Sequence, residues 1–193
     1  MKIRYAIEVF IVFVGSTIWA HAQVASTKHN LSVSGPGTIK ATTEQQICVF
    51  CHTPHNASSV AQLWNRSQPS TVYTLYSSDY LTSKAYAAPS QINAKSKLCM
   101  SCHDGTIALG AVINAPGSGA GSISMSGGVT TMPVGSAGHI GSVLSDDHPV
   151  GFGYDPVKDP ELINRAFPWN SAVKLDPDAS NGRVECHTCH DPH

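Results

Sequence analysis

The chain has 193 residues, of which 41% are hydrophobic, 7% aromatic and 13% charged, with a formal net charge of −1. The near-neutral balance and the lack of a basic patch exclude a typical nucleic-acid-binding protein. The 16 Gly and 12 Pro residues, with so few aromatic residues, predict a loop-rich chain with little conventional core.

The first 22 residues have the pattern of a secretory signal peptide. Lys2 and Arg4 form a basic start, residues 7–18 are mostly apolar, and the run ends at a small-residue cleavage site before Gln23. The alternative is an uncleaved anchor, but the apolar run is shorter than the ~20 residues of a spanning helix. We expect residues 1–22 to be removed and residues 23–193 to form one periplasmic or extracellular domain without a membrane span.

The next segments predict short elements separated by turns. Residues 27–37 end in Gly-Pro-Gly, which predicts an extended arm with a turn. Thr42 or Thr43, with a Gln three residues later, has the capping-box spacing that begins a short helix, and this helix is expected to carry residues 48–52. Residues 71–76 have high β propensity and predict brief pairing.

The second half predicts a similar alternation. Ser96 is the expected cap of a helix over 99–103, and Asp104-Gly105 predicts a turn. Residues 114–142 are rich in Gly and Ser, which indicates a flexible surface loop or a segment ordered by a neighbouring molecule. Asp159, followed by Pro160, has the pattern of a helix start, and Asn181-Gly182 that of a tight turn.

One five-residue pattern occurs three times and uses every cysteine of the chain. It is Cys48-Val-Phe-Cys51-His52, Cys99-Met-Ser-Cys102-His103 and Cys186-His-Thr-Cys189-His190. This C-x-x-C-H pattern is the attachment signature of a c-type haem, in which two thiols form thioethers and the histidine is the proximal iron ligand. Redox disulfides and zinc sites are the alternatives, but neither needs a His after each second Cys. The sequence therefore predicts three haem c groups.

Each iron needs a second axial ligand if it is six-coordinate, and the chain has more histidines than it needs. Methionine is the other common ligand, but histidine is in better supply, which favours bis-histidine iron of low potential. His148 is stiffened by the proline after it, and His29 lies at the start of the arm. The candidate distal ligands are His148, His29, His55, His193 and His139.

Two further residues have two interpretations each. Trp64 either stacks on a porphyrin or packs in the protein, and Arg66 either holds a haem propionate or is a solvated surface charge. His55 and His193 each follow a proximal His in a His-x-Pro-His pattern. Neither can reach the far face of its own haem, so each would serve a neighbouring haem.

Residues 29–37, 48–55, 63–66, 98–106, 146–150 and 189–193 together resemble the multihaem cytochromes c with doubled CxxCH motifs, the electron-transfer proteins of metal- and sulfur-respiring bacteria. The resemblance spans nearly all of residues 23–193. It implies bis-histidine haems in a stacked chain, and some relatives form extracellular filaments. Relatives often continue past Cys-His-x-Pro-His to another haem motif, so a four-haem arrangement is not carried over to this chain.

The expected fold is mostly irregular with a few short α-helices, a multihaem cytochrome c wrapped around stacked haems. The expected function is electron transfer to and from other redox proteins, without an enzyme activity. A small haem-dependent oxyanion reductase and a subunit of an extracellular cytochrome filament, or another homo-oligomer, are the alternatives.

Overall fold

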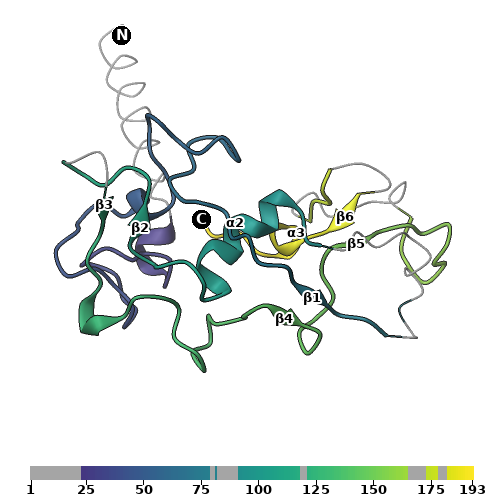
Figure 1. Ribbon diagram of the computed structural model, residues 1–193. Helices are drawn as coiled ribbons and strands as arrows, with labels where there is room; N and C mark the ends of the chain where they lie inside the picture. The colour runs from purple at the N-terminus through teal and green to yellow at the C-terminus, as the bar shows by residue number, and fades with distance from the viewer. Residues whose placement is uncertain (1–22, 79–80, 82–90, 118–120, 165–172, 178–181) are drawn as a thin grey trace, which may run out of the picture.

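The computed structural model describes residues 23–78, 81, 91–117, 121–164, 173–177 and 182–193 (Figure 1). Most of this chain is irregular, as expected from its composition. The described part contains two α-helices, α2 (Ala94–His103) and α3 (Cys186–Cys189), and short 3-10 turns at η1 (Gln23–Ser26), η2 (Cys48–Phe50) and η4 (Ser126–Gly128). The expected signal peptide lies outside the described residues. No helix in the described ranges is long and apolar enough to cross a membrane.

Helix α2 carries the second CxxCH motif at its C-terminal end. Asn93 caps it, because its side chain accepts a hydrogen bond from the backbone N–H of Ser96 at 2.9 Å. The expectation that Ser96 is the cap was wrong, since the helix begins two residues before it. The helix ends at the expected Asp104-Gly105 turn, where Gly105 adopts a φ of +73° that favours glycine.

The first CxxCH motif lies in the 3-10 turn η2, and not in the capped helix that the sequence predicted. Thr42 does not cap, because its hydroxyl and its backbone N–H both donate to the carbonyl of Ser124. Ala41 pairs with Met125 in an adjoining bridge. The segment before the first motif is therefore held against the Gly- and Ser-rich region instead of coiling on itself.

Three short ladders join distant parts of the chain. The expected pairing near residues 71–76 is confirmed, since β1 (Thr74–Leu75) runs parallel to β4 (Val143–Leu144). The other two ladders are antiparallel and join β2 (Ala111–Val112) to β3 (Gly121–Ser122) and β5 (Phe152–Gly153) to β6 (Arg183–Val184). The prediction of a helix at Asp159 was wrong for residues 159–164, where the Asp159 side chain accepts from the Glu161 N–H in a turn. Asn181 of the expected tight turn lies outside the described residues.

The apolar core of the described chain is small and divided. One cluster contains Tyr73, Ile92, Met100 and Leu144, and a second contains Ala41, Val49 and Phe50. Several of the most deeply buried side chains are polar and belong to hydrogen-bonded networks, among them Asn30, Ser32, Asn65, Arg66, Ser96, Ser101 and Glu185. Both apolar clusters include residues of a CxxCH motif, so what core there is lies next to the motifs.

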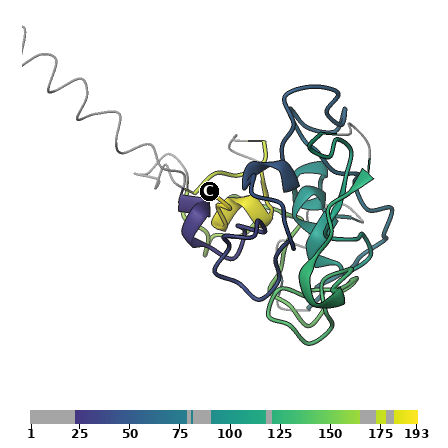
Figure 2. The same ribbon diagram turned by 90° about the vertical axis from the view of Figure 1, so that its left-hand side faces the viewer.

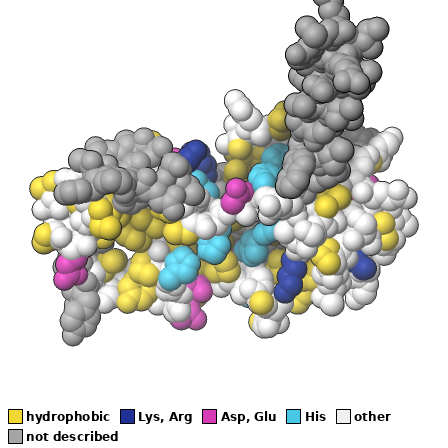
Figure 3. All heavy atoms as spheres, turned by 180° about the vertical axis from the view of Figure 1, so that it is seen from behind, with side chains coloured by type: hydrophobic (Ala, Val, Ile, Leu, Met, Phe, Trp, Pro, Cys, Tyr) yellow, Lys and Arg dark blue, Asp and Glu magenta, His cyan; other side chains and the backbone are white. Residues whose placement is uncertain are grey.

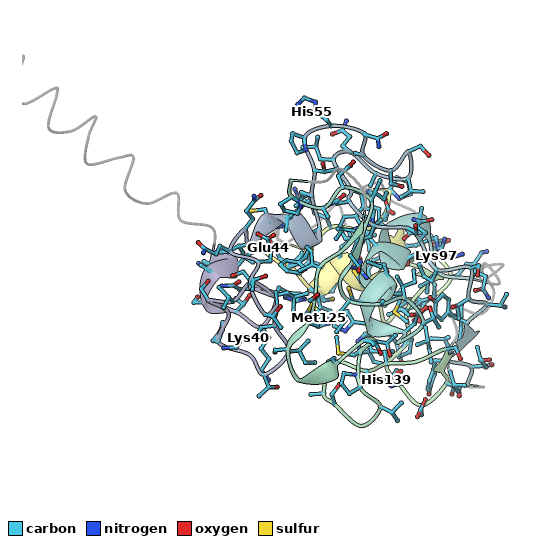
Figure 4. The ribbon with its side chains drawn as sticks, turned by 60° about the vertical axis from the view of Figure 1, so that its left-hand side comes forward. Lys40, Glu44, His55, Lys97, Met125 and His139 are labelled. Atoms are coloured by element: carbon cyan, nitrogen blue, oxygen red, sulfur yellow. The ribbon has the colours of Figure 1, made fainter. Side chains whose placement is uncertain are left out.

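The described part of residues 114–142 is tied to the rest of the chain. Backbone hydrogen bonds join Ile123 to Gly110, Ser126 to Lys40 and Thr130 to Leu109. Figure 4 labels Lys40 and Met125, which belong to the two segments that the Ser126–Lys40 bond joins. The described part of the segment is therefore positioned by bonds to its own chain.

Candidate haem-attachment site

The histidine of the first motif faces the last residue of the chain. The imidazole centroids of His52 and His193 are 5.9 Å apart and the ring planes are inclined by 22°. Asp191 directs His193, because its carboxylate accepts the His193 backbone N–H at 2.9 Å and lies 3.5 Å from Nδ1. Figure 2 shows the C-terminus beside the N-terminal segment that carries the first motif.

The histidine of the second motif faces the expected N-terminal candidate. The centroids of His103 and His29 are 6.1 Å apart, with ring planes at 63°. Nδ1 of His103 lies 2.6 Å from the Gly138 carbonyl oxygen. A proton on Nδ1 donated to that carbonyl leaves the Nε2 lone pair free for a metal. The backbone N–H groups of Ile140 and Gly141 both donate to the His103 carbonyl, so residues 138–141 hold His103 in place.

The histidine of the third motif faces the proline-stiffened candidate. The centroids of His190 and His148 are 6.3 Å apart and the rings are nearly parallel, at 15°. Nδ1 of His148 is 3.3 Å from the carbonyl oxygen of Pro149. Each CxxCH histidine therefore faces one histidine from a remote part of the sequence.

The spacing of these three pairs fits an iron between two imidazoles. Two metal–imidazole bonds of about 2 Å each, with half a ring on either side, separate the ring centroids by about 6 Å. The observed distances of 5.9, 6.1 and 6.3 Å agree with that value. The residues present therefore fit three haems with two histidine ligands each. In the described ranges, no group of three or more His, Cys, Asp or Glu side chains has the arrangement of a metal site formed by protein ligands alone.

Two of these imidazoles have lowered pKa values. Burial, reinforced by the neighbouring His103 and His193, lowers the pKa of His29. Burial and the nearby His193 lower the pKa of His52. A neutral imidazole is the form that binds metal, so both shifts favour ligation.

Two of the expected distal candidates do not face a CxxCH histidine in the described structure. His55 is exposed at the outer edge of the molecule, on the loop labelled in Figure 4. Its carbonyl accepts hydrogen bonds from Thr53 and Asn114, but its ring has no aromatic contact within the described chain. His139 is half-buried, with its ring next to Gly105 and Gly141, on the outside of the segment that holds His103.

Two cavities adjoin the histidine pairs. One of about 410 Å³ is lined by residues that include Cys48, His52 and Leu63. The other, of about 340 Å³, is shared by the second and third motifs and is lined by residues that include His29, His103, His148, Cys186 and His190. Figure 3 shows histidine side chains gathered along a hollow on one face, with hydrophobic side chains around them. Both volumes lie in the range of small-molecule sites, and the linings offer the apolar contact that a porphyrin needs.

A buried glutamate joins the second motif to the third. Glu185 is 1% exposed, and its carboxylate accepts from the Ser96 hydroxyl at 2.6 Å and forms an ion pair with Arg183 at 2.7 Å. It also forms a capping box with Thr188 at the start of α3. The Ser96 hydroxyl in turn accepts from the Cys186 N–H at 3.1 Å. One carboxylate therefore fixes the start of α3 against the first turn of α2.

The first cysteines of these two motifs are in contact. A hydrogen bond with Cys99 lowers the pKa of the Cys186 thiol to about 7, and the same bond raises the pKa of the Cys99 thiol. The thioether-forming sides of the second and third sites therefore lie against each other.

Arg66 differs from both interpretations offered by the sequence. It is 1% exposed, so it is no solvated charge, and its guanidinium donates to neutral oxygens of α2 and of residues 108–109. These bonds use four of its five N–H donors within the protein. Trp64 packs edge-on to His52, with centroids 6.0 Å apart, and its indole N–H is buried without a protein acceptor.

Several of these supporting residues were not expected. Glu185 precedes a cysteine at a helix start, where an acidic cap is a recognisable signal. Gly138 contributes a backbone carbonyl, which no side-chain pattern reveals. No protein-family model matches the chain, and no curated protein matches it either.

Proposed function

We propose that the protein is an exported electron-transfer protein that carries three covalent haems, each with two histidine ligands, as in the multihaem cytochromes c that its motifs resemble. The observation that carries the proposal is the pairing of every CxxCH histidine with a remote histidine at the spacing of a shared iron. The chain would then be a wrapper around its haems, which fits its small and divided apolar core.

Each attachment site has a complete set of protein groups. Cys48 and Cys51 would anchor the first haem, with His52 and His193 as ligands. Cys99 and Cys102 would anchor the second, with His103 and His29, and Cys186 and Cys189 the third, with His190 and His148. A haem held in this way supplies reversible one-electron chemistry, and the protein sets its potential through ligands, hydrogen bonds and burial.

The same pairing argues against the oxyanion reductase. Such an enzyme needs an iron position that a substrate can occupy, and here a histidine faces each proximal ligand. A carrier needs no such position, because electrons pass through porphyrin edges to other periplasmic or outer-surface redox proteins. A filament subunit remains compatible with the carrier, and no contact of the described chain favours it.

Intact mass and spectroscopy of the purified mature protein test the proposal. We expect three haem masses that survive acid-acetone extraction, low-spin ferric spectra, and little carbon monoxide binding after dithionite reduction. The matched control is the double variant Cys186→Ala, Cys189→Ala, which should lose one haem mass. Fewer than three haems in the parent, or a stoichiometric high-spin haem that binds carbon monoxide at once, would reject this proposal.

A further inference from the structure

Arg66 is a buried cation whose charge has no carboxylate partner in the described structure. Its Nε donates to the Ser101 hydroxyl at 3.2 Å, and its Nη2 donates to the Ser101 and Ala108 carbonyls at 3.0 and 2.9 Å. Its Nη1 donates to the Leu109 carbonyl at 2.7 Å. These neutral oxygens accept from four of the five N–H donors but do not cancel the charge, so the surroundings of Arg66 carry a net positive potential.

The position of Arg66 links the first two motifs. Ser101, which binds the guanidinium twice, lies between the two cysteines of the second motif. The neighbouring Asn65 donates its backbone N–H to the Cys51 carbonyl at 2.8 Å, and its side chain donates to the Val49 carbonyl at 2.7 Å. The guanidinium is therefore bound directly to the second motif, and Arg66 follows a residue that is bound to the first.

The third motif lies away from these bonds. The four acceptors of the guanidinium belong to Ser101 of α2 and to residues 108–109, whereas the third motif meets α2 through Ser96, nearer the start of that helix.

The other buried charges near the motifs are acidic. Asp104, directly after His103, is 4% exposed and accepts hydrogen bonds from Thr71, Tyr73 and Thr106. It counteracts Arg66 at the second site only. At the third site the buried charge is Glu185, which Arg183 pairs and so largely neutralises.

We infer that Arg66 raises the reduction potentials of the haems at Cys48–His52 and Cys99–His103 above the potential of the haem at Cys186–His190. The inference rests on the proposed function. A reduced haem carries one positive charge less than an oxidised one, so a buried cation nearby stabilises the reduced form. Electrons that enter at the third site would then move toward the other two sites.

Potentiometric titration of the intact three-haem protein tests this inference. Arg66→Met removes the charge and keeps much of the side-chain volume, and should move two of the three components to lower potential. Asp104→Asn removes the opposing charge and should move one component to higher potential. Lys95→Met removes an exposed cation from the same helix, and should move none, since solvent screens that charge.

The assignment of the components comes from the Cys186→Ala, Cys189→Ala variant, which lacks the third attachment site. In that background both remaining components should fall on addition of Arg66→Met. Unchanged components, or an equal fall of all three in the intact protein, would overturn the inference.

If Arg66→Met does not mature, Arg66→Gln is the second neutral variant, since its amide can still donate to one carbonyl. If neither variant matures, the Asp104→Asn variant decides between the outcomes. A potential of the second haem that is unchanged or lower in this variant overturns the inference. A parent with fewer than three haems would reject the proposed function itself, which separates the two failures.

Discussion

The imidazoles of His52 and His193 are stacked 5.9 Å apart, although they belong to the first motif and to the last residue of the chain. His190, three residues before His193, faces His148 instead. The C-terminal His-Asp-Pro-His therefore reaches two different histidine pairs. Under the proposed function this short segment would hold two irons at a fixed separation.

Replacement of His193 should therefore open the first haem alone. His193→Ala removes the imidazole that faces His52, so one of three irons should become high-spin and bind carbon monoxide when reduced. Electron paramagnetic resonance of the ferric form and a carbon monoxide titration measure the change. The control is His55→Ala, which has the same local His-x-Pro-His pattern but a ring that faces no CxxCH histidine in the described structure. If His55→Ala opened an iron and His193→Ala did not, the pairing would be reversed.

The third haem offers an independent test of the same kind. His148→Ala removes the ring that faces His190 at 6.3 Å, and should produce one high-spin iron with the other two unchanged. His139→Ala is the matched control, since its ring lies outside the histidine pairs. An unchanged low-spin spectrum of His148→Ala, together with a high-spin signal in His139→Ala, would transfer the role to His139.

The turn that positions His29 depends on one glycine. A Cβ at Gly35 would meet the carbonyl oxygen of Asn30, whose side chain holds Ser32 through two hydrogen bonds. Gly35→Ala should thus cost about 1–3 kcal/mol of stability, since backbone cannot move aside as a side chain can. Denaturant unfolding measures it, and ligation at the second haem should weaken as well. Gly37→Ala is the control, because its nearest neighbour would be 3.8 Å away. Equal losses in both variants would contradict this account.

Much of the general architecture was readable from the sequence because it depends on local chemistry. The irregular fold followed from composition, and the Asp104-Gly105 turn and the β1 pairing followed from residue type. The three CxxCH positions needed no structure at all. His29, His148 and His193 were all among the expected candidates, but their partners depend on contacts between remote segments.

Three of the incorrect expectations have a common physical cause, which is tertiary bonding that overrides a local pattern. Thr42 has capping-box spacing, yet Ser124 occupies its hydroxyl and its N–H. Residues 27–37 were expected to form an extended arm with a turn, yet the buried side chains of Asn30 and Ser32 fold them into successive turns. Arg66 is of a residue type usually found at the surface, but its side chain is buried and donates to four carbonyl and hydroxyl oxygens. Local propensity carries no information on such long-range partners.

The link between α2 and α3 depends on Glu185. Glu185→Ala would leave Arg183 and Ser96 without their buried acceptor and remove the capping box of α3. Removal of one partner from a buried ion pair costs about 3–5 kcal/mol. Thermal or denaturant unfolding should show that loss, with reduced haem loading at Cys186 and Cys189. Lys95→Ala breaks an exposed ion pair with Asp176 and should cost only about 0–1 kcal/mol. A smaller loss in Glu185→Ala than in Lys95→Ala would contradict the assigned role.

Acid should destabilise the protein through its histidine ligands. Burial and neighbouring imidazoles lower the pKa of His29 and of His52 in the folded chain, whereas the unfolded values are near 6.5. The folded state therefore binds fewer protons than the unfolded state over this range. The stability that these groups contribute is present above about pH 6.5 and is lost as the pH falls through their lowered folded pKa values. Iron ligation acts in the same direction, because protonation competes with the metal for the imidazole.

The expected result is a denaturation midpoint that is flat from pH 8 to about 6.5 and falls below it, with low-spin iron converting to high-spin over the same acid range. Guanidinium unfolding at each pH, with the visible spectrum recorded in parallel, measures both. His55→Gln removes an exposed imidazole that faces no other histidine, so its curve should overlay that of the parent. A midpoint that rose with acidification would contradict this account. It would show that the folded state binds more protons than the unfolded state, whereas lowered histidine pKa values require the opposite.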